Sequence, residues 1–269
     1  MLGKLLKYEF KNGAKLMPVV FLGTGIVFLL AWFFKAIHVG QLMLPMMIVL
    51  VIGAIACVLV PFVFIIMRYH KGVFGAEGYL TNTLPVSEGT ILASRMITGF
   101  VWYLLGMLFC ILAIFAMCFL AGVPNFAAVL QQIFQRYWMP ILVFGIVLLI
   151  QMAMSISAIY FSITLANIPA FSRNNIAFSV LFYFLSYTVM SFVELGGMLL
   201  IPLGIRIDAV NGEMSLVAES MFSYFMDSVQ GNANTHMVIG VGSAIVDLVF
   251  AAAFIFVTWK LLKRKVMIK

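Results

Sequence analysis

Six long apolar runs constrain this chain more than any other feature of its sequence. They cover residues 16–34, 42–67, 96–120, 138–165, 176–201 and 238–259. A membrane-spanning helix needs about 20 predominantly apolar residues, so each run is long enough to cross a bilayer. Backbone groups inside a bilayer must be hydrogen-bonded within the protein, and no run shows the two-residue alternation of a barrel strand. The sequence therefore predicts an all-α membrane protein with six transmembrane helices.

The composition excludes a water-soluble fold. Apolar residues make up 65% of the 269 residues and charged residues only 9%, whereas charged residues make up about 25% of an ordinary soluble domain. Lipid must therefore cover most of the surface. We expect residues 1–269 to form a single transmembrane domain.

Lysine and arginine predict the orientation of the chain in the membrane. If the N-terminus lies inside, 13 of the 16 basic residues fall on the inner side, and Lys35, Arg136 and Arg206 fall outside. Basic residues concentrate in cytoplasmic connections, so both termini are predicted to be cytoplasmic. The net charge of +7 then reflects topology and attraction to anionic lipids. No basic segment is interleaved with exposed aromatic residues, so nucleic acid is not an expected partner.

Residues 1–15 are predicted to form an amphipathic helix in the inner membrane interface. Glu9 interrupts its apolar face. Either Glu9 reaches out to water from an imperfect helix, or it pairs with Arg68 or Arg95 and fixes this helix to the others. The lysines share the opposite face and are Lys4, Lys7, Lys11 and Lys15.

The inner connection 68–95 is the longest on the cytoplasmic side. Pro85 ends any helix before it, while Ser87 is a favourable N-cap with Glu88 in the first helical turn. We therefore expect a helix that begins here and continues into the third span. The short excursion before it presents apolar side chains, which either dock a partner or pack against the inner ends of the spans. These side chains are Tyr79, Leu80, Leu84 and Val86.

The outer connections are predicted to carry further helices. Ser215–Val229 has the apolar pattern of a helix resting on the outer interface, within the long connection 202–237. A similar segment covers residues 126–135. Such helices shape a lid or lean on lipid more often than they bind a substrate.

Two carboxylates fall within the predicted spans. Asp247 is expected near the middle of the sixth span and Glu194 toward the outer part of the fifth. A charge at the bilayer centre costs roughly 2.5–3.5 kcal/mol on insertion scales. Each carboxylate is therefore part of a substrate or proton path, or is held by a structural hydrogen bond to a neighbouring helix.

The motifs of catalysis are absent from the sequence. It contains no phosphate-binding loop, no H-E-x-x-H and no G-x-S-x-G. The acidic residues and histidines form no metal-ligand pattern, and the three cysteines all fall within the second and third apolar runs. We therefore expect no enzymatic activity, no cofactor and no metal in this chain.

The stretch LLKYEFK, the first span and then EGYLTNTLPVS before the third span resemble permease subunits of bacterial type 2 ABC (ATP-binding cassette) exporters, especially those of Gram-positive bacteria. The resemblance covers about residues 1–105 and is only topological beyond. It implies an N-terminal connecting helix and a coupling helix that docks on a separate ATPase subunit. That docking surface would comprise Glu77, Tyr79, Leu80, Thr83, Leu84, Pro85 and Val86.

The same resemblance implies the partners and the location of the chain. ATP and magnesium would be bound by the ATPase subunit, and a second permease, identical or different, would lie alongside in a bacterial cytoplasmic membrane. A helical re-entrant segment would occupy residues 202–237. Two other interpretations stay open, namely a non-transport assembly or sensor partner and a proton-coupled carrier that uses Asp247.

Overall fold

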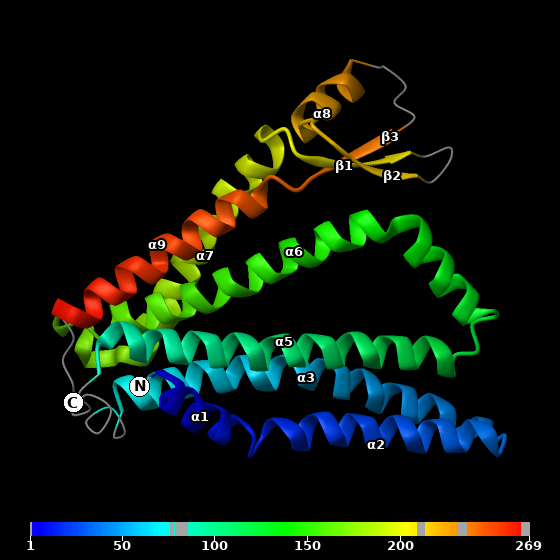
Figure 1. Ribbon diagram of the computed structural model, residues 1–269, viewed down its shortest axis with the longest axis horizontal. Helices are drawn as coiled ribbons and strands as arrows, with labels where there is room; N and C mark the ends of the chain where they lie inside the picture. Colours follow the sequence, from blue (N-terminus) through cyan, green and yellow to red (C-terminus); the bar gives the residue numbers. More distant parts are fainter. Residues whose placement is uncertain (1, 76–77, 79–85, 209–212, 231–235, 265–269) are drawn as a thin grey trace. The chain divides into compact units, whose positions relative to one another are not determined.

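The computed structural model describes residues 2–75, 78, 86–208, 213–230 and 236–264. Six of the described helices are long and apolar enough to cross a membrane, which supports the prediction of a multi-pass membrane protein (Figure 1). They are α2 (Met17–Ala36), α3 (Met43–Val73), α5 (Glu88–Leu120), α6 (Phe126–Ala166), α7 (Asn175–Leu200) and α9 (Ser243–Arg264). The chain divides into two compact units, residues 1–126 and 127–266.

Several helices begin or end away from the predicted bounds. Helix α5 starts at Glu88, immediately after the extended residue Ser87, as the N-cap pattern predicted. The Ser87 hydroxyl hydrogen-bonds the Thr90 side chain, with 2.8 Å between the oxygens, and does not cap a backbone amide. In α6 the non-helical backbone of Tyr137 marks a kink. The predicted outer helix 126–135 is therefore the first segment of α6.

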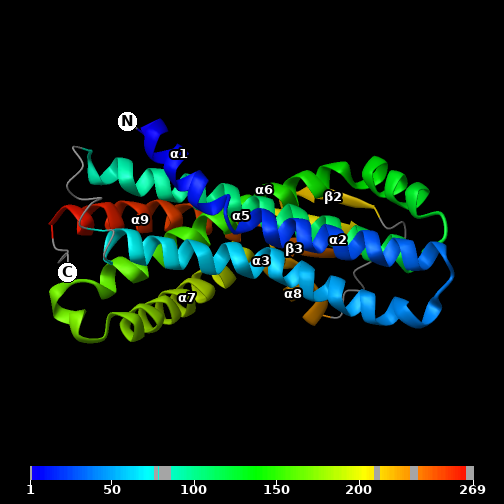
Figure 2. The same cartoon turned by 90° about the horizontal axis from the view of Figure 1, so that it is seen from below.

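The first unit is built on close packing of α3 against α2 and α5. Its core contains Met17, Phe21, Cys57 and Trp102, all at least nine-tenths buried. Phe21 and Phe109 stack with their ring centroids 4.4 Å apart. These three helices run side by side in both views (Figures 1 and 2). A short 3-10 helix, η1 (Gly40–Leu42), connects α2 to α3.

Helix α1 (Leu2–Gly13) packs along α5 in the same unit. Phe10 lies against Trp102, with ring centroids 6.2 Å apart, and Gly13 leaves no room for a β-carbon beside the Trp102 indole. Lys4, Lys7 and Lys11 are exposed. The helix ends two residues before Lys15, so the predicted range 1–15 is slightly too long.

In the second unit, α6, α7 and α9 share an apolar core of Met154, Ala158, Met190 and Ala251. Phe161 of α6 also stacks on a phenylalanine of α9, with centroids 4.8 Å apart. The segment before α7 is the 3-10 helix η2 (Pro169–Asn174). These three helices therefore form the apolar core of the second unit.

A three-stranded antiparallel sheet lies between α7 and α9, so the all-α prediction is incomplete. Its order is β2 (Met214–Val217), β1 (Gly204–Asp208), β3 (His236–Gly240). Gly204 pairs with Val217 on one side and Gly240 on the other. The expectation of a purely helical excursion in 202–237 is therefore wrong.

The helix predicted over Ser215–Val229 is correct only in its second half, where α8 (Met221–Val229) forms. The first half contains strand β2, whose backbone hydrogen-bonds β1. Ser220 then caps α8, because its side chain accepts a hydrogen bond from the Ser223 amide at 3.2 Å. Tyr224 of α8 lies against His236 of β3, with ring centroids 6.1 Å apart. One face of the sheet is covered in this way.

Candidate functional site

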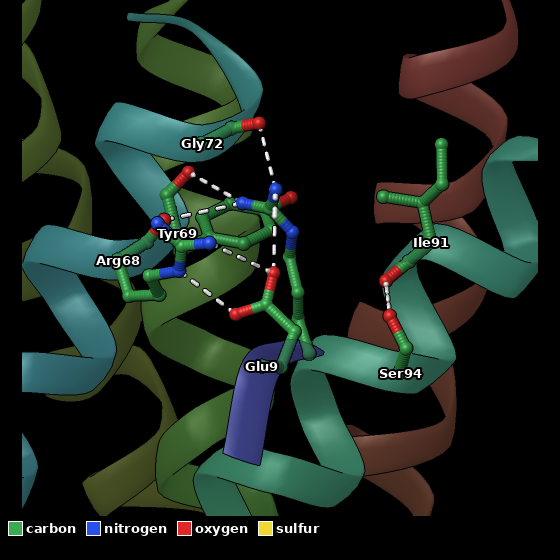
Figure 3. A network of polar contacts seen from close by, with 7 residues as sticks. Glu9, Arg68, Tyr69, Gly72, Ile91 and Ser94 are labelled. Atoms are coloured by element: carbon green, nitrogen blue, oxygen red, sulfur yellow. Dashed lines mark hydrogen bonds and ion pairs between the residues drawn. The ribbon is translucent and has the colours of Figure 1, made fainter. Parts of the chain in front are cut away.

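The strongest candidate site joins three helices of the first unit through Glu9, Arg68 and Arg95. We call these residues the Glu9–Arg68–Arg95 cluster. Arg68 Nε donates to Glu9 Oε2 at 2.8 Å, and Arg68 Nη2 donates to Glu9 Oε1 at 3.3 Å. Arg95 Nη2 lies 3.9 Å from Glu9 Oε1. The side chains converge from α1, α3 and α5 (Figure 3). Of the two interpretations of Glu9, the structure shows the pairing.

Arg95 holds the end of α3 as well as the carboxylate. It is only 4% exposed, and its Nη1 donates to the carbonyl of Arg68 at 3.1 Å and to that of Tyr69 at 3.4 Å. Its Nη2 donates to the carbonyl of Gly72 at 2.7 Å. The last carbonyls of a helix lack intrahelical partners and carry partial negative charge, so a guanidinium is well suited to this place. Arg95 therefore ties α5 to the end of α3.

Small residues allow this close approach. A β-carbon on Gly72 would lie 2.5 Å from both terminal nitrogens of Arg95, so only glycine leaves room for the guanidinium. Glu9 is 8% exposed, although the lysines of the same helix are exposed. Its burial is explained by the two cations, because a buried charge requires a partner.

The cluster contains one acid and two permanent cations. Such a combination can hold helices together by ion pairs and hydrogen bonds, and it does not correspond to a known catalytic arrangement. It holds no nucleophile paired with a base. Among the described residues, no group of three or more His, Cys, Asp or Glu could hold a metal ion. The cluster can fix the relative positions of α1, α3 and α5 at the ends of α3 and α5 that border residues 74–87.

Most residues of the predicted docking surface lie outside the described residues. These are Glu77, Tyr79, Leu80, Thr83, Leu84 and Pro85. Val86 is described, and it is half-buried in a bend just before α5. The structure thus shows how the chain leaves α3 and enters α5, at the Glu9–Arg68–Arg95 cluster.

The structure brings the other two candidate carboxylates together. The Asp247 side chain of α9 lies beside that of Glu194 on α7. Gly197 of α7 permits this contact because a β-carbon there would meet Val246. Asp247 is 1% exposed, and neither Asp247 Oδ1 nor Glu194 Oε1 receives a hydrogen bond from a donor in the described part of the chain.

Asp247 lies nearer the start of the sixth long helix than the sequence predicts. Residues 238–240 belong to strand β3, and α9 begins only at Ser243. Asp247 therefore lies about one turn from the start of α9, because a turn contains 3.6 residues. The apolar run was read as one helix across the glycines 240 and 242, where the strand ends.

Gly72 and Trp102 are the site residues that sequence reasoning missed. Trp102 packs against Gly13 and Phe10 and so positions α1, on which Glu9 is carried. A glycine close to the end of a long helix was the available signal for Gly72, although it does not identify the arginine that needs the space.

Comparisons of the chain with protein-family models, with curated proteins and with solved structures found no match.

Proposed function

We propose that this chain is the transmembrane permease subunit of an ABC exporter in a bacterial cytoplasmic membrane. In this role both termini lie in the cytoplasm, and α1 lies in the inner membrane interface. The chain has no enzymatic activity; a separate ATPase subunit binds ATP and magnesium. Two permease subunits, identical or different, form the path for the substrate.

The Glu9–Arg68–Arg95 cluster is the observation that carries the proposal. Residues 77–86, which resemble a coupling helix, are bordered by the ends of α3 and α5, and Arg95 joins those ends. A force applied to the connection would therefore reach both helices together. Helix α5 continues from Glu88 to Leu120 and can carry the movement along its length.

The arrangement of α1 supports the same role. Its exposed lysines suit the headgroups of anionic lipids, whereas Glu9 on the other side of the helix is buried against Arg68. A helix lying in the inner interface would be held to the bundle by the Glu9 contacts with Arg68 and Arg95 and by the packing of Phe10 and Gly13 on Trp102. This is the geometry expected of a connecting helix.

In the proposed mechanism, two ATPase subunits close on ATP and move the docked residues 77–86. The movement passes through Ser87 into α5 and through the cluster into α3 and α1. A rigid-body tilt of the two permease subunits then opens a path between them. The apolar surface of the chain is compatible with many substrates, and the proposal is confined to export.

Co-purification tests the proposal. The membrane chain is co-expressed and purified with each phosphate-loop ATPase of its own cell, and the ratio of the two subunits is measured. Leu84→Asp is expected to abolish association because it places a charge in the apolar docking surface. Val229→Asp, at the exposed end of α8, is the matched control and should leave the ratio unchanged. Normal recovery of the ATPase with Leu84→Asp would refute the docking surface.

A second candidate function is favoured by one observation, the contact between Glu194 and Asp247. Two neighbouring carboxyl groups within apolar helices are typical of a proton path, which a proton-coupled carrier requires. This candidate requires transport without ATP and its loss on Asp247→Asn. Asp227→Asn, in the exposed part of α8, is the control. Transport that persists in Asp247→Asn and depends on ATP would eliminate the carrier.

A further inference from the structure

An apolar groove with two cations at one end lies within the first unit. Its volume is about 380 Å³, and it is lined by Leu16 and by one face of α3 that begins at Leu59 and ends at Lys71. The lining residues of α3 follow the spacing of a single helical stripe. Apolar residues occupy the stripe as far as Met67, and Arg68 and Lys71 follow. We call this the Leu16–Lys71 groove.

The length of the groove suits a lipid chain. The apolar part of the stripe, from Leu59 to Met67, extends about 12 Å along the helix axis at 1.5 Å per residue. It therefore covers about two fifths of a hydrocarbon core that is about 30 Å thick. The exposed side chain of Val63 forms part of its apolar wall. A long hydrocarbon chain fills such a wall, whereas a polar solute has almost no polar atom to bind there.

The cations fix the chemistry of the other end. Lys71 is exposed two residues before the end of α3, and Lys side chains bind phosphate as compact point charges. Arg68 lies one turn earlier and is shared with Glu9. Under the proposed topology this end faces the cytoplasmic leaflet, where basic pockets beside transmembrane helices bind anionic headgroups.

We infer that the Leu16–Lys71 groove binds an anionic phospholipid. One acyl chain lies along Leu16 and the apolar stripe of α3, and the phosphate lies against Lys71 with Arg68 beside it. The leaflet assignment rests on the proposed function, while the groove itself does not. A lipid held here adjoins the Glu9–Arg68–Arg95 cluster, because Arg68 belongs to both sites.

Lipid retention by the purified chain alone, without the ATPase, tests the inference. Native mass spectrometry measures the bound fraction of phosphatidylglycerol and of phosphatidylcholine at equal concentrations. The wild type is expected to retain one phosphatidylglycerol at least tenfold more strongly than phosphatidylcholine. Lys71→Gln should remove this preference, and Val63→Trp should reduce binding of both lipids by filling the groove.

Lys260→Gln is the matched control, because Lys260 is an exposed lysine of α9 that does not line the groove. It should retain the wild-type preference. The site would be refuted if Lys71→Gln and Lys260→Gln weakened phosphatidylglycerol binding equally, since general surface charge would then explain the binding. It would also be refuted if inorganic phosphate alone displaced the lipid at equal concentration. Loss of ATPase association leaves this result unaffected, so the two proposals fail separately.

Discussion

At the scale of single residues, Arg95 has the largest expected effect on stability. It is buried, and it contacts the carbonyls of three residues of α3 as well as the Glu9 carboxylate. Its removal leaves the buried Glu9 carboxylate with one cation fewer and the end of α3 without its donors. Breaking a buried pair by removing one partner costs about 3–5 kcal/mol.

We therefore expect Arg95→Ala to lower the free energy of unfolding by about 3–5 kcal/mol. Glu9→Gln should cost less, about 1–3 kcal/mol, because its amide keeps one acceptor for Arg68. Thermal unfolding of the purified chain in detergent measures both. Equal effects of the two variants would show that Arg95 does not act through the end of α3.

Gly72 gives a second prediction at this scale. In Gly72→Ala the new β-carbon would displace the Arg95 guanidinium from the carbonyls of α3. We expect a loss of about 1–3 kcal/mol, as for other overpacked sites. Gly3→Ala in α1 is the control, because a β-carbon at Gly3 meets no atom within 4 Å. Similar melting temperatures for wild type and Gly72→Ala would contradict the steric argument.

Glu219 supplies a pH dependence outside the membrane spans. A hydrogen bond from Arg206 holds the pKa of the Glu219 carboxyl below its ordinary value of 4.5. The folded state therefore gains stability from this pair above pH 4.5, and loses it as the pH falls through the lowered pKa. Both side chains are more than a third exposed, so the gain is at most about 1 kcal/mol.

Amide hydrogen exchange in β1 measures this contribution. At neutral pH, Arg206→Gln should lower the protection factors of β1 by up to about fivefold, which corresponds to 1 kcal/mol. The difference between variant and wild type should disappear as the pH falls below 4.5. A difference that persists unchanged in acid would show that Arg206 stabilises the sheet by another route.

At the scale of elements, the close approach of α3 and α5 depends on Gly106. A β-carbon there would collide with the backbone carbonyl of Cys57, and backbone yields less easily than a side chain. Gly106→Ala should lower the free energy of unfolding of the first unit by about 1–3 kcal/mol. Gly145→Ala in α6 is the control, since a β-carbon there meets nothing within 4 Å. Matching unfolding temperatures for the two variants would contradict this contact.

The helices were more predictable than the segments between them. Burial in lipid requires long uncharged runs, so α2, α3, α5, α6 and α7 could be located from hydropathy alone. The pairing of Glu9 could be predicted because an acid on an apolar helical face needs a cation. The sequence does not predict that Glu9 contacts both Arg68 and Arg95, since that depends on how three helices cross.

The sheet was missed for a physical reason. Strands β1 and β3 are separated by 27 residues of sequence, from 209 to 235, and each satisfies its backbone through the other. No local pattern contains that pairing. Val238 and Ile239 also extend the apolar run of α9, so hydropathy alone predicts a helix that starts too early and has Asp247 near its middle.

At the scale of the whole molecule, the proposed function makes the chain a passive partner of an ATPase. In this role it would bind the ATPase through residues 77–86 and transmit movement through the Glu9–Arg68–Arg95 cluster. Arg95→Lys keeps the charge but loses the planar fork that reaches several carbonyls at once. We therefore expect it to retain the ATPase while lowering transport per ATP hydrolysed, as measured in vesicles.

ATP hydrolysis by the complex in lipid vesicles is the most direct test of the central claim. The ATPase is assayed alone, with the wild-type chain and with Leu84→Asp, across a panel of apolar peptides, lipids and drugs. The account predicts that the wild-type chain changes the hydrolysis rate, that at least one compound stimulates it further, and that Leu84→Asp gives the rate of the ATPase alone. A rate that is the same with and without the wild-type chain for every compound would contradict the permease assignment.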